Sequence, residues 1–326
     1  MHYKSGPVRL SRIVTSEDAF RITTTRNDVD LLAAAITECG LINPPILLPT
    51  VNRRYVVVCG FRRIAACRYL GWEHVDARFL AAGTPRIQCA LAAIVDNCSQ
   101  RELNLIETAR ALKLLSANLS DDKDVAALAA RAGLAVAAAI LPKIRSLCDL
   151  PDFLQQGLID GTLSLPMAER LRHLPAEDVQ EVYDLFCELR AGLNVQREIL
   201  DNALESARRE GVQTRDILRS EGLLRLRKDA EIDRGRKTAL IRKKLKARRY
   251  PALAAAEEAF SRRSSALGLR GDMKLVPPAG FEGTDYSLTL RFRSLDQLKD
   301  QKAAIDRLID GGILKEILCP TWQSPE

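Results

Sequence analysis

The feature that most constrains the fold is a change in hydrophobic periodicity near residue 100. Before that point, short apolar runs bounded by turn residues alternate with runs of helical period. Strands are predicted by PPILLP, YVVVCG and VDARFL, and helices that end at glycines are predicted by LLAAAITECG and FRRIAACRYLGW. Strands interleaved with helices over residues 1–100 predict a small mixed α+β domain.

Beyond residue 100 the patterns are helical alone. Breaks rich in Gly, Pro or Asp separate six predicted helices: RELNLIETARALKLL, DVAALAARAG, PDFLQQGLIDG, LPMAERLRHL, AEDVQEVYDLFCELRAG and VQREILDNALESARREG. Residues 101–211 are therefore expected to form an all-helical domain.

One pair of these segments has the layout of a helix-turn-helix. Small apolar residues of DVAALAARAG can pack inward, and Gly133 can make the turn before LAVAAAILPKIRSLCDLP. The second segment would enter the major groove, where its DNA-binding candidates are Lys143, Arg145 and Ser146. Pro142 predicts that this helix begins or kinks there. The alternative is a helix pair retained for packing.

The positive charge of the chain is concentrated in one segment. Residues 225–249 hold twelve Lys or Arg and three acids, a local net charge of +9, whereas the whole chain carries +7. Such a segment suits a polyanion such as DNA, and residues 212–250 are predicted to be a basic linker or helix. Its DNA-binding candidates are Arg242, Lys243, Lys244, Lys246, Arg248 and Arg249. The alternative is a solvated basic helix between two domains.

Residues 251–326 predict a third unit, made of a helix, a hairpin and a closing helix. In YSLTLRFR, the apolar Tyr286, Leu288, Leu290 and Phe292 alternate with polar residues, so that one face can be buried. A unit of fewer than about 80 residues has a thin core by itself. We therefore expect it to pack against a partner, with a homodimer as the simplest choice.

Two protein classes are disfavoured by the remaining composition. No apolar run approaches the ~18 residues of a membrane span, and the opening MHYKSGPVRL lacks the apolar region of a signal peptide. We therefore expect a cytoplasmic, nucleoid-associated protein with no membrane partner. The eight cysteines are scattered without a CxxC pair, which argues against a zinc site.

A candidate phosphate cradle follows the predicted strand VVVC. In GFRRIAAC, Gly60 lies at the strand-to-helix turn and is followed by Arg62 and Arg63. Free backbone N–H groups, the helix dipole and two guanidinium groups would converge there on a phosphate. The alternative is a simple turn glycine beside two surface charges.

A second candidate lies in DNCSQRELNLIE. Asp96 and Asn97 follow an apolar run, and Arg101 comes shortly after them. A carboxylate and an amide beside an arginine can share a hydrated Mg²⁺ and a phosphate tail. The alternative is a helix N-cap with an acidic first turn.

Four stretches in this order resemble the ParB family of chromosome and plasmid partition proteins. The family's first box, a G-x-x-x-P-I-type turn, is matched by residues 40–46, and its second box, G-E-R-R-x-R-A, by residues 60–66. The third, E-N-x-x-R before a helix with L-N-P-x-E, is matched by residues 96–107. The fourth lies in LCDLPDFLQQGLIDGTLSLPMAERLRHLP, with its L-P, G-x-L-S and A-x-x-L landmarks. The resemblance covers roughly residues 8–210.

The resemblance implies a ParB/sulfiredoxin-like N-terminal fold and a DNA clamp that CTP gates in chromosome or plasmid segregation. It assigns nucleotide binding to Asn43, Gly60, Arg62, Arg63, Asp96, Asn97 and Arg101. Gly60 and the two arginines after it would hold phosphates, and Asp96 and Asn97 would lie near Mg²⁺ and the triphosphate.

The chain departs from the family's boxes at three positions. Phe61 stands where the second box has glutamate, Ala65 stands where it has its third arginine, and Arg101 comes one residue later than E-N-x-x-R predicts. CTP binding remains the expectation, whereas a weak CTPase activity and a partner ATPase are left open.

Two other functions stay open. A ParB-like transcriptional or replication regulator without nucleotide chemistry would keep the basic segment and the helix-turn-helix, and CTP binding would distinguish it. A phosphoryl-handling or nuclease enzyme would draw on the relation of this N-terminal fold to sulfiredoxin-like and nuclease-like proteins. That enzyme would need an acid, base or nucleophile, and His2, His74 and His173 all lie far from the boxes.

Overall fold

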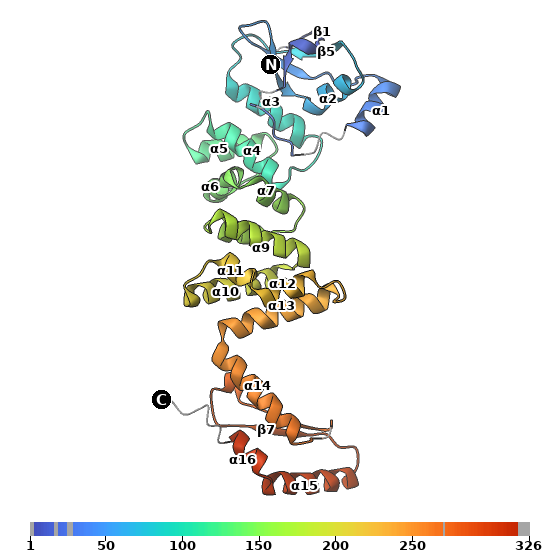
Figure 1. Ribbon diagram of the computed structural model, residues 1–326. Helices are drawn as coiled ribbons and strands as arrows, with labels where there is room; N and C mark the ends of the chain where they lie inside the picture. Colours follow the sequence, from blue (N-terminus) through green and yellow to red (C-terminus); the bar gives the residue numbers. More distant parts are fainter. Residues whose placement is uncertain (1–2, 16–18, 25–28, 270, 319–326) are drawn as a thin grey trace. The chain divides into compact units, whose positions relative to one another are not determined.

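The computed structural model of the chain describes residues 3–15, 19–24, 29–269 and 271–318 (Figure 1). Internal contacts divide the chain into two compact units, Met1–Arg172 and His173–Glu326. The finer division into residues 1–100, 101–211, 212–250 and 251–326 stays a prediction. Over the described ranges, no helix combines the length and the apolar character that crossing a membrane requires.

The first unit contains a five-stranded sheet in the order β1-β5-β3-β4-β2. Its strands are β1 (Lys4–Arg9), β2 (Ile13–Val14), β3 (Ile46–Pro49), β4 (Tyr55–Cys59) and β5 (His74–Phe79). Strand β3 runs antiparallel to β4 and parallel to β5, while β1 is antiparallel to β5. The three strands predicted from apolar runs are confirmed. The sequence analysis missed β1 and β2, because KSGPVR buries only Val8 and β2 is two residues long.

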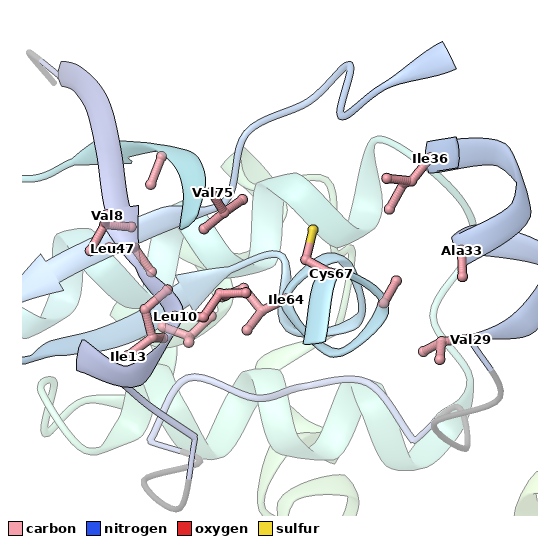
Figure 2. Close-up of a cluster of buried hydrophobic side chains, with 13 residues drawn as sticks. Val8, Leu10, Ile13, Val29, Ala33, Ile36, Leu47, Ile64, Cys67 and Val75 are labelled. Atoms are coloured by element: carbon pink, nitrogen blue, oxygen red, sulfur yellow. The ribbon is translucent and has the colours of Figure 1, made fainter. Parts of the chain in front are cut away.

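The sheet packs with helices α1 (Asp30–Cys39), α2 (Phe61–Tyr69) and α3 (Arg86–Cys98). Figure 2 shows the core that the sheet shares with α1 and α2, in which Leu47 and Val75 of the strands lie with Ile64 and Cys67 of α2. These four side chains are at most 2% exposed. The two predicted helices, α1 and α2, are confirmed, and this mixed domain confirms the predicted α+β class.

The helical part of the first unit has α4 (Leu105–Ser116), α5 (Asp122–Arg131), α6 (Leu141–Arg145), α7 (Asp152–Ile159) and α8 (Leu165–Leu171). Gly133, with φ of 91°, makes the predicted turn after α5. Pro142 lies in the first turn of α6, as predicted. The second helix of the pair is only five residues long, however, because 3₁₀ turns η2 (Ala138–Ile140) and η3 (Ser146–Asp149) flank it.

The second unit begins with α9 (Ala176–Leu189), α10 (Leu193–Glu210), α11 (Thr214–Leu218), α12 (Glu221–Lys228) and α13 (Arg234–Arg249). The basic segment therefore forms two helices, and α13 packs against α9, α10 and α12. Ile241 and Leu245 of α13 are at most 1% exposed. Burial of these side chains makes the segment part of a helical layer rather than a free linker.

The unit ends with α14 (Pro251–Ala266), β6 (Met273–Val276), β7 (Ser287–Leu290), α15 (Leu295–Asp310) and α16 (Gly312–Leu318), as predicted up to α15. Strands β6 and β7 form an antiparallel pair that buries Met273 and Leu275. The expected apolar face of YSLTLRFR is not buried within the unit, since Leu288 is 38% and Phe292 is 52% exposed.

Candidate functional site

A cavity of about 320 Å³ lies in the first unit, where β4 passes into α2. All seven residues predicted to bind nucleotide line it: Asn43, Gly60, Arg62, Arg63, Asp96, Asn97 and Arg101. They come from three separate stretches of chain, so the fold brings together what the sequence spreads over about sixty residues. The volume is at the lower end of the range of small-molecule sites.

Gly60 makes the turn that aims the N-terminus of α2 at this cavity. Its φ is 91°, and a Cβ at this position would lie 3.0 Å from Cβ of Pro45. Both the left-handed backbone and the close approach therefore require glycine. Within the described residues, no side chain caps this end of α2, so its first N–H groups are available to an anion.

Arg63 holds three parts of the cavity wall together. Its Nη1 donates to the Asn43 carbonyl oxygen at 2.8 Å, and its Nη2 donates to Oδ2 of Asp96 at 3.0 Å. Its side chain is 16% exposed. Arg62, the other predicted phosphate ligand, is exposed on the first turn of α2. The two neighbouring arginines thus differ in exposure, and Arg63 cross-links the site.

Asp96 and Asn97 lie in the last turn of α3, which corrects the alternative that they cap a following helix. The residue that caps α4 is Asn104, in a capping box with Glu107. The Asn97 amide donates from Nδ2 to the Ala93 carbonyl oxygen at 2.8 Å, and Asp96 accepts from Gln100 Nε2 at 3.3 Å. Both residues present oxygen atoms at one end of the cavity.

Arg101 forms a two-point ion pair with Glu107. Nη1 lies 2.6 Å from Oε2, and Nη2 lies 2.7 Å from Oε1. Burial by itself would raise the pKa of Glu107, but hydrogen bonds from Arg101, Thr24 and Asn104 outweigh it and lower the pKa to about 2. Glu107 was not among the residues predicted to bind nucleotide; the N-x-x-E spacing of a capping box could have marked it as a structural acid.

The other wall of the cavity is apolar. It includes Phe20, Ile22, Leu32 and Phe61, of which Phe20 and Ile22 are at most 3% exposed. The sequence analysis missed residues 20–23, because no periodic pattern marks them. Cys59 also lines the cavity, and burial raises its pKa to about 12, so it remains a neutral thiol.

The DNA-binding candidates of the helix-turn-helix lie together on α6 and the turn after it. Lys143 is exposed, whereas Nη1 of Arg145 donates to Asp122 at 3.0 Å and to Ser116 Oγ at 2.7 Å. The hydroxyl of Ser146 donates to the Lys143 carbonyl oxygen at 2.9 Å. Of these three, Lys143 alone has a side chain without a polar partner within the described residues.

The candidates of the basic segment all lie on α13, but several are bound to acids of the same unit. Arg242 donates from Nε to Glu198 at 2.9 Å, and Arg248 donates from Nη2 to Glu210 at 2.6 Å. Lys246 lies 3.9 Å from Glu257, and Arg249 donates to Asn202 at 3.2 Å. In the described part of the chain, Lys243 and Lys244 are exposed and have no acidic partner.

Comparisons with known proteins find similarity in the first part of the chain. Residues 5–107 match the ParB N-terminal domain. The nucleoid occlusion protein of Bacillus cereus (strain B4264) is 30% identical over 183 residues, which is 55% of this chain and 60% of that protein. That of Bacillus anthracis (strain A0248) is 29% identical over the same coverage. The chain thus spans about 60% of the length of these curated relatives.

Two solved structures of the chromosome-partitioning protein ParB from Caulobacter crescentus, both C-terminally truncated, also match. The complex with CTP-γ-S is 21% identical with a TM-score of 0.27, over 56% of this chain and 99% of that chain. The complex with the centromeric parS site is 18% identical with a TM-score of 0.33, over 55% and 91%. The match of residues 5–107 to the ParB N-terminal domain confirms the resemblance seen in the sequence.

Proposed function

We propose that this chain is a DNA-binding, partition-type protein whose first unit binds CTP, and that nucleotide binding gates a clamp on DNA during chromosome or plasmid segregation. The observation that carries the proposal is the convergence of seven predicted nucleotide ligands on one cavity beside an uncapped helix N-terminus. The curated relatives are nucleoid occlusion proteins, which agrees with a role at the nucleoid.

The two ends of the cavity suit the two ends of a nucleotide. The N–H groups of the first turn of α2, with Arg62 and Arg101, form a cationic end for the phosphates. Phe61, Phe20 and Ile22 form an apolar end for the base and ribose. Arg63 keeps the Asn43 turn and Asp96 in place between these ends.

A magnesium ion fits beside Asp96 and Asn97 when a triphosphate is bound. Asp96 supplies a carboxylate, and the Asn97 amide, anchored through Nδ2, supplies an oxygen. Mg²⁺ commonly takes one or two protein oxygens and completes its shell with phosphate and water. Among the described residues no cluster of three or more His, Cys, Asp or Glu could hold a metal, so phosphate oxygens would supply the remaining ligands.

DNA binding is assigned to both units. In the first, Lys143 of the short helix α6 is the exposed candidate. In the second, Lys243 and Lys244 carry uncompensated charge on α13. The low base-reading capacity of α6 favours contacts to phosphates, which position a protein on DNA without selecting a sequence.

A homodimer is the proposed assembly, through the segment 251–326. Its strand pair and α15 leave apolar side chains uncovered, including Leu288, Phe292 and Leu295 at 38%, 52% and 69% exposed. Exposed apolar patches of this kind are typical of association surfaces. Light scattering of Phe292→Glu/Leu295→Glu should show a monomer where the unchanged protein shows a dimer; a monomeric unchanged protein would contradict the assignment.

Titration with labelled CTP, ATP and GTP, each with and without DNA, tests the central proposal. CTP should bind in the micromolar to low millimolar range and more tightly than the other two, and phosphate release measures any weak CTPase activity. If no nucleotide binds at millimolar concentration, the result would favour the second candidate function, a ParB-like regulator without nucleotide chemistry. The replacement of the box glutamate by Phe61 is the observation that favours it.

A further inference from the structure

Arg101 uses only part of its hydrogen-bonding capacity within the described residues. Of its five N–H groups, the two on Nη1 reach the Glu102 carbonyl oxygen at 3.1 Å and Oε2 of Glu107. One on Nη2 reaches Oε1 of Glu107. The second N–H of Nη2 and that of Nε have no acceptor in the described part of the chain. A guanidinium presents such a pair in parallel, with the spacing of two phosphate oxygens.

Glu107 cannot easily release Arg101. Its side chain is fully buried, and Arg101 is the only cation bonded to it among the described residues. Removing the cation from a buried ion pair leaves an uncompensated charge, which is strongly unfavourable. A ligand anion is therefore not expected to pull Arg101 away from Glu107. It is expected to meet the edge of the guanidinium that Glu107 leaves open.

The same carboxylate also fixes the opposite wall of the cavity. Oε1 of Glu107 accepts from the Thr24 backbone N–H at 2.9 Å and from the Thr24 hydroxyl at 3.2 Å. Arg110, one turn further along α4, donates to the Thr23 carbonyl oxygen at 3.2 Å, and Thr23 lines the cavity. Two residues of α4 thus hold the segment that follows Phe20 and Ile22.

We propose that Glu107 is the positioning residue of the nucleotide site: it orients Arg101 so that the free Nε and Nη2 edge binds the phosphate chain of a nucleoside triphosphate. The assignment rests on the proposed nucleotide site and deepens it. Because Glu107 is the N3 residue of α4 and bonds Thr24, it also connects both walls of the cavity to the first helix of the helical part of this unit.

Affinity for CTP in four variants tests the role. Arg101→Ala should weaken CTP binding by about 10- to 100-fold, the value of a lost charge-assisted fork. Glu107→Gln should weaken it by roughly tenfold or more, because an amide N–H₂ facing the guanidinium displaces it. The double variant should bind no more weakly than Arg101→Ala, since glutamine keeps an acceptor oxygen for Thr24 and the remaining effect of Glu107 on CTP acts through Arg101. Glu181→Gln removes a buried carboxylate that two arginines bind in the other unit, and should leave CTP affinity unchanged.

Arg101→Lys covers the case in which Glu107→Gln does not fold. Lysine keeps a positive charge beside Glu107 but has no second edge, so CTP should bind as weakly as it does to Arg101→Ala. Wild-type affinity in Arg101→Lys or Glu107→Gln, or additive losses in the double variant, would overturn the positioning role.

A ligand-free measurement separates this inference from the proposed function. In ¹⁵N spectra, the two Nη groups of Arg101 should give separate signals, because the ion pair hinders rotation, and the signals should merge in Glu107→Gln. Merged signals in the unchanged protein would overturn the positioning role whether or not CTP binds. Absence of CTP binding together with separate signals would overturn only the nucleotide site.

Discussion

The cavity of the first unit and the basic helices of the second use the same chemistry in different ways. Around the cavity, Arg101 is bound to a buried carboxylate and still has two N–H groups to offer. On α12, the side chain of Arg227 is 11% exposed and forms ion pairs with Glu181 and Glu188. One arrangement prepares an arginine for a ligand, and the other fastens two helices together.

The difference shows that local charge in a sequence is not the charge available to a polyanion. Five of the twelve basic residues in 225–249 have a carboxylate partner: Arg225, Arg227, Arg242, Lys246 and Arg248. Those carboxylates come mostly from α9 and α10, far away in sequence. Within residues 225–249, five cations are exposed and have no acidic partner in the described part of the chain: Lys228, Arg234, Arg236, Lys243 and Lys244.

Arg227→Ala should have the largest effect, on stability alone. It leaves buried Glu181, whose side chain is 7% exposed, with Arg219 as its remaining partner. Breaking a buried ion pair costs about 3–5 kcal/mol, which urea unfolding would show. The matched control is Arg225→Ala, because its pair with Glu221 is 79% exposed on both sides and is worth less than about 0.5 kcal/mol. Equal losses in the two variants would mean that burial does not distinguish these arginines.

Acid should lower the unfolding free energy of the first unit by protonating Glu107. The folded pKa of about 2 lies below the ordinary value of 4.5, so the stabilisation is present above pH 4.5 and is lost as the pH falls through 2. The shift corresponds to roughly 3 kcal/mol at neutral pH. The difference in unfolding free energy between the unchanged protein and Glu107→Gln should shrink by about this amount between pH 5 and pH 2. A constant difference over that range would contradict the assigned pKa.

Arg62→Ala and Arg63→Ala should separate a ligand-binding arginine from one that also supports the fold. Each should lower CTP affinity by about 1.5–3 kcal/mol, and the double variant should abolish binding at working concentrations. Arg63→Ala should also lower the melting temperature, because it releases the Asn43 carbonyl and Asp96. An unchanged melting temperature in Arg63→Ala would remove the cross-linking role of Arg63.

Most of the fold of the first unit could be predicted, because its elements carry local signals. Strands β3 and β4 are continuous apolar runs, β5 alternates buried and exposed residues, and α1 ends at Gly40. The exceptions are elements whose stability comes from distant partners. Strand β1 contains Gly6 and Pro7 and exists through its pairing with β5.

The candidate site was predicted through box residues, and its remaining parts have no local signature. Phe20 and Ile22 reach the cavity through tertiary packing, and the contact of Thr24 with Glu107 spans 83 residues. The ion pairs of α13 could not be predicted from the sequence for the same reason, since Glu198 is 44 residues away from Arg242. Long-range electrostatics is the part that a single sequence leaves undetermined.

The smallest expected effect is on the salt dependence of DNA binding, and it tests the distinction between paired and unpaired cations directly. Each phosphate neutralised adds about −0.9 to the log–log slope. Lys243→Gln/Lys244→Gln removes two exposed, unpaired charges and should flatten the slope by about 2 with unchanged stability. Arg242→Gln/Arg248→Gln removes two charges that Glu198 and Glu210 already balance, so it should change the slope by less than about 1 while lowering stability.

Each double variant should change the salt dependence equally on two duplexes of unrelated sequence, because phosphate contacts carry no sequence information. The combined change of Arg242, Lys243, Lys244 and Lys246 would then flatten the slope by about 2 rather than by about 4, since two of these four are paired. Flattening by about 4 would show that DNA opens the ion pairs of α13 and recruits the paired residues. Loss of affinity for one duplex alone would instead assign the recognition to base contacts, and Lys143 of α6 would become the first residue to change.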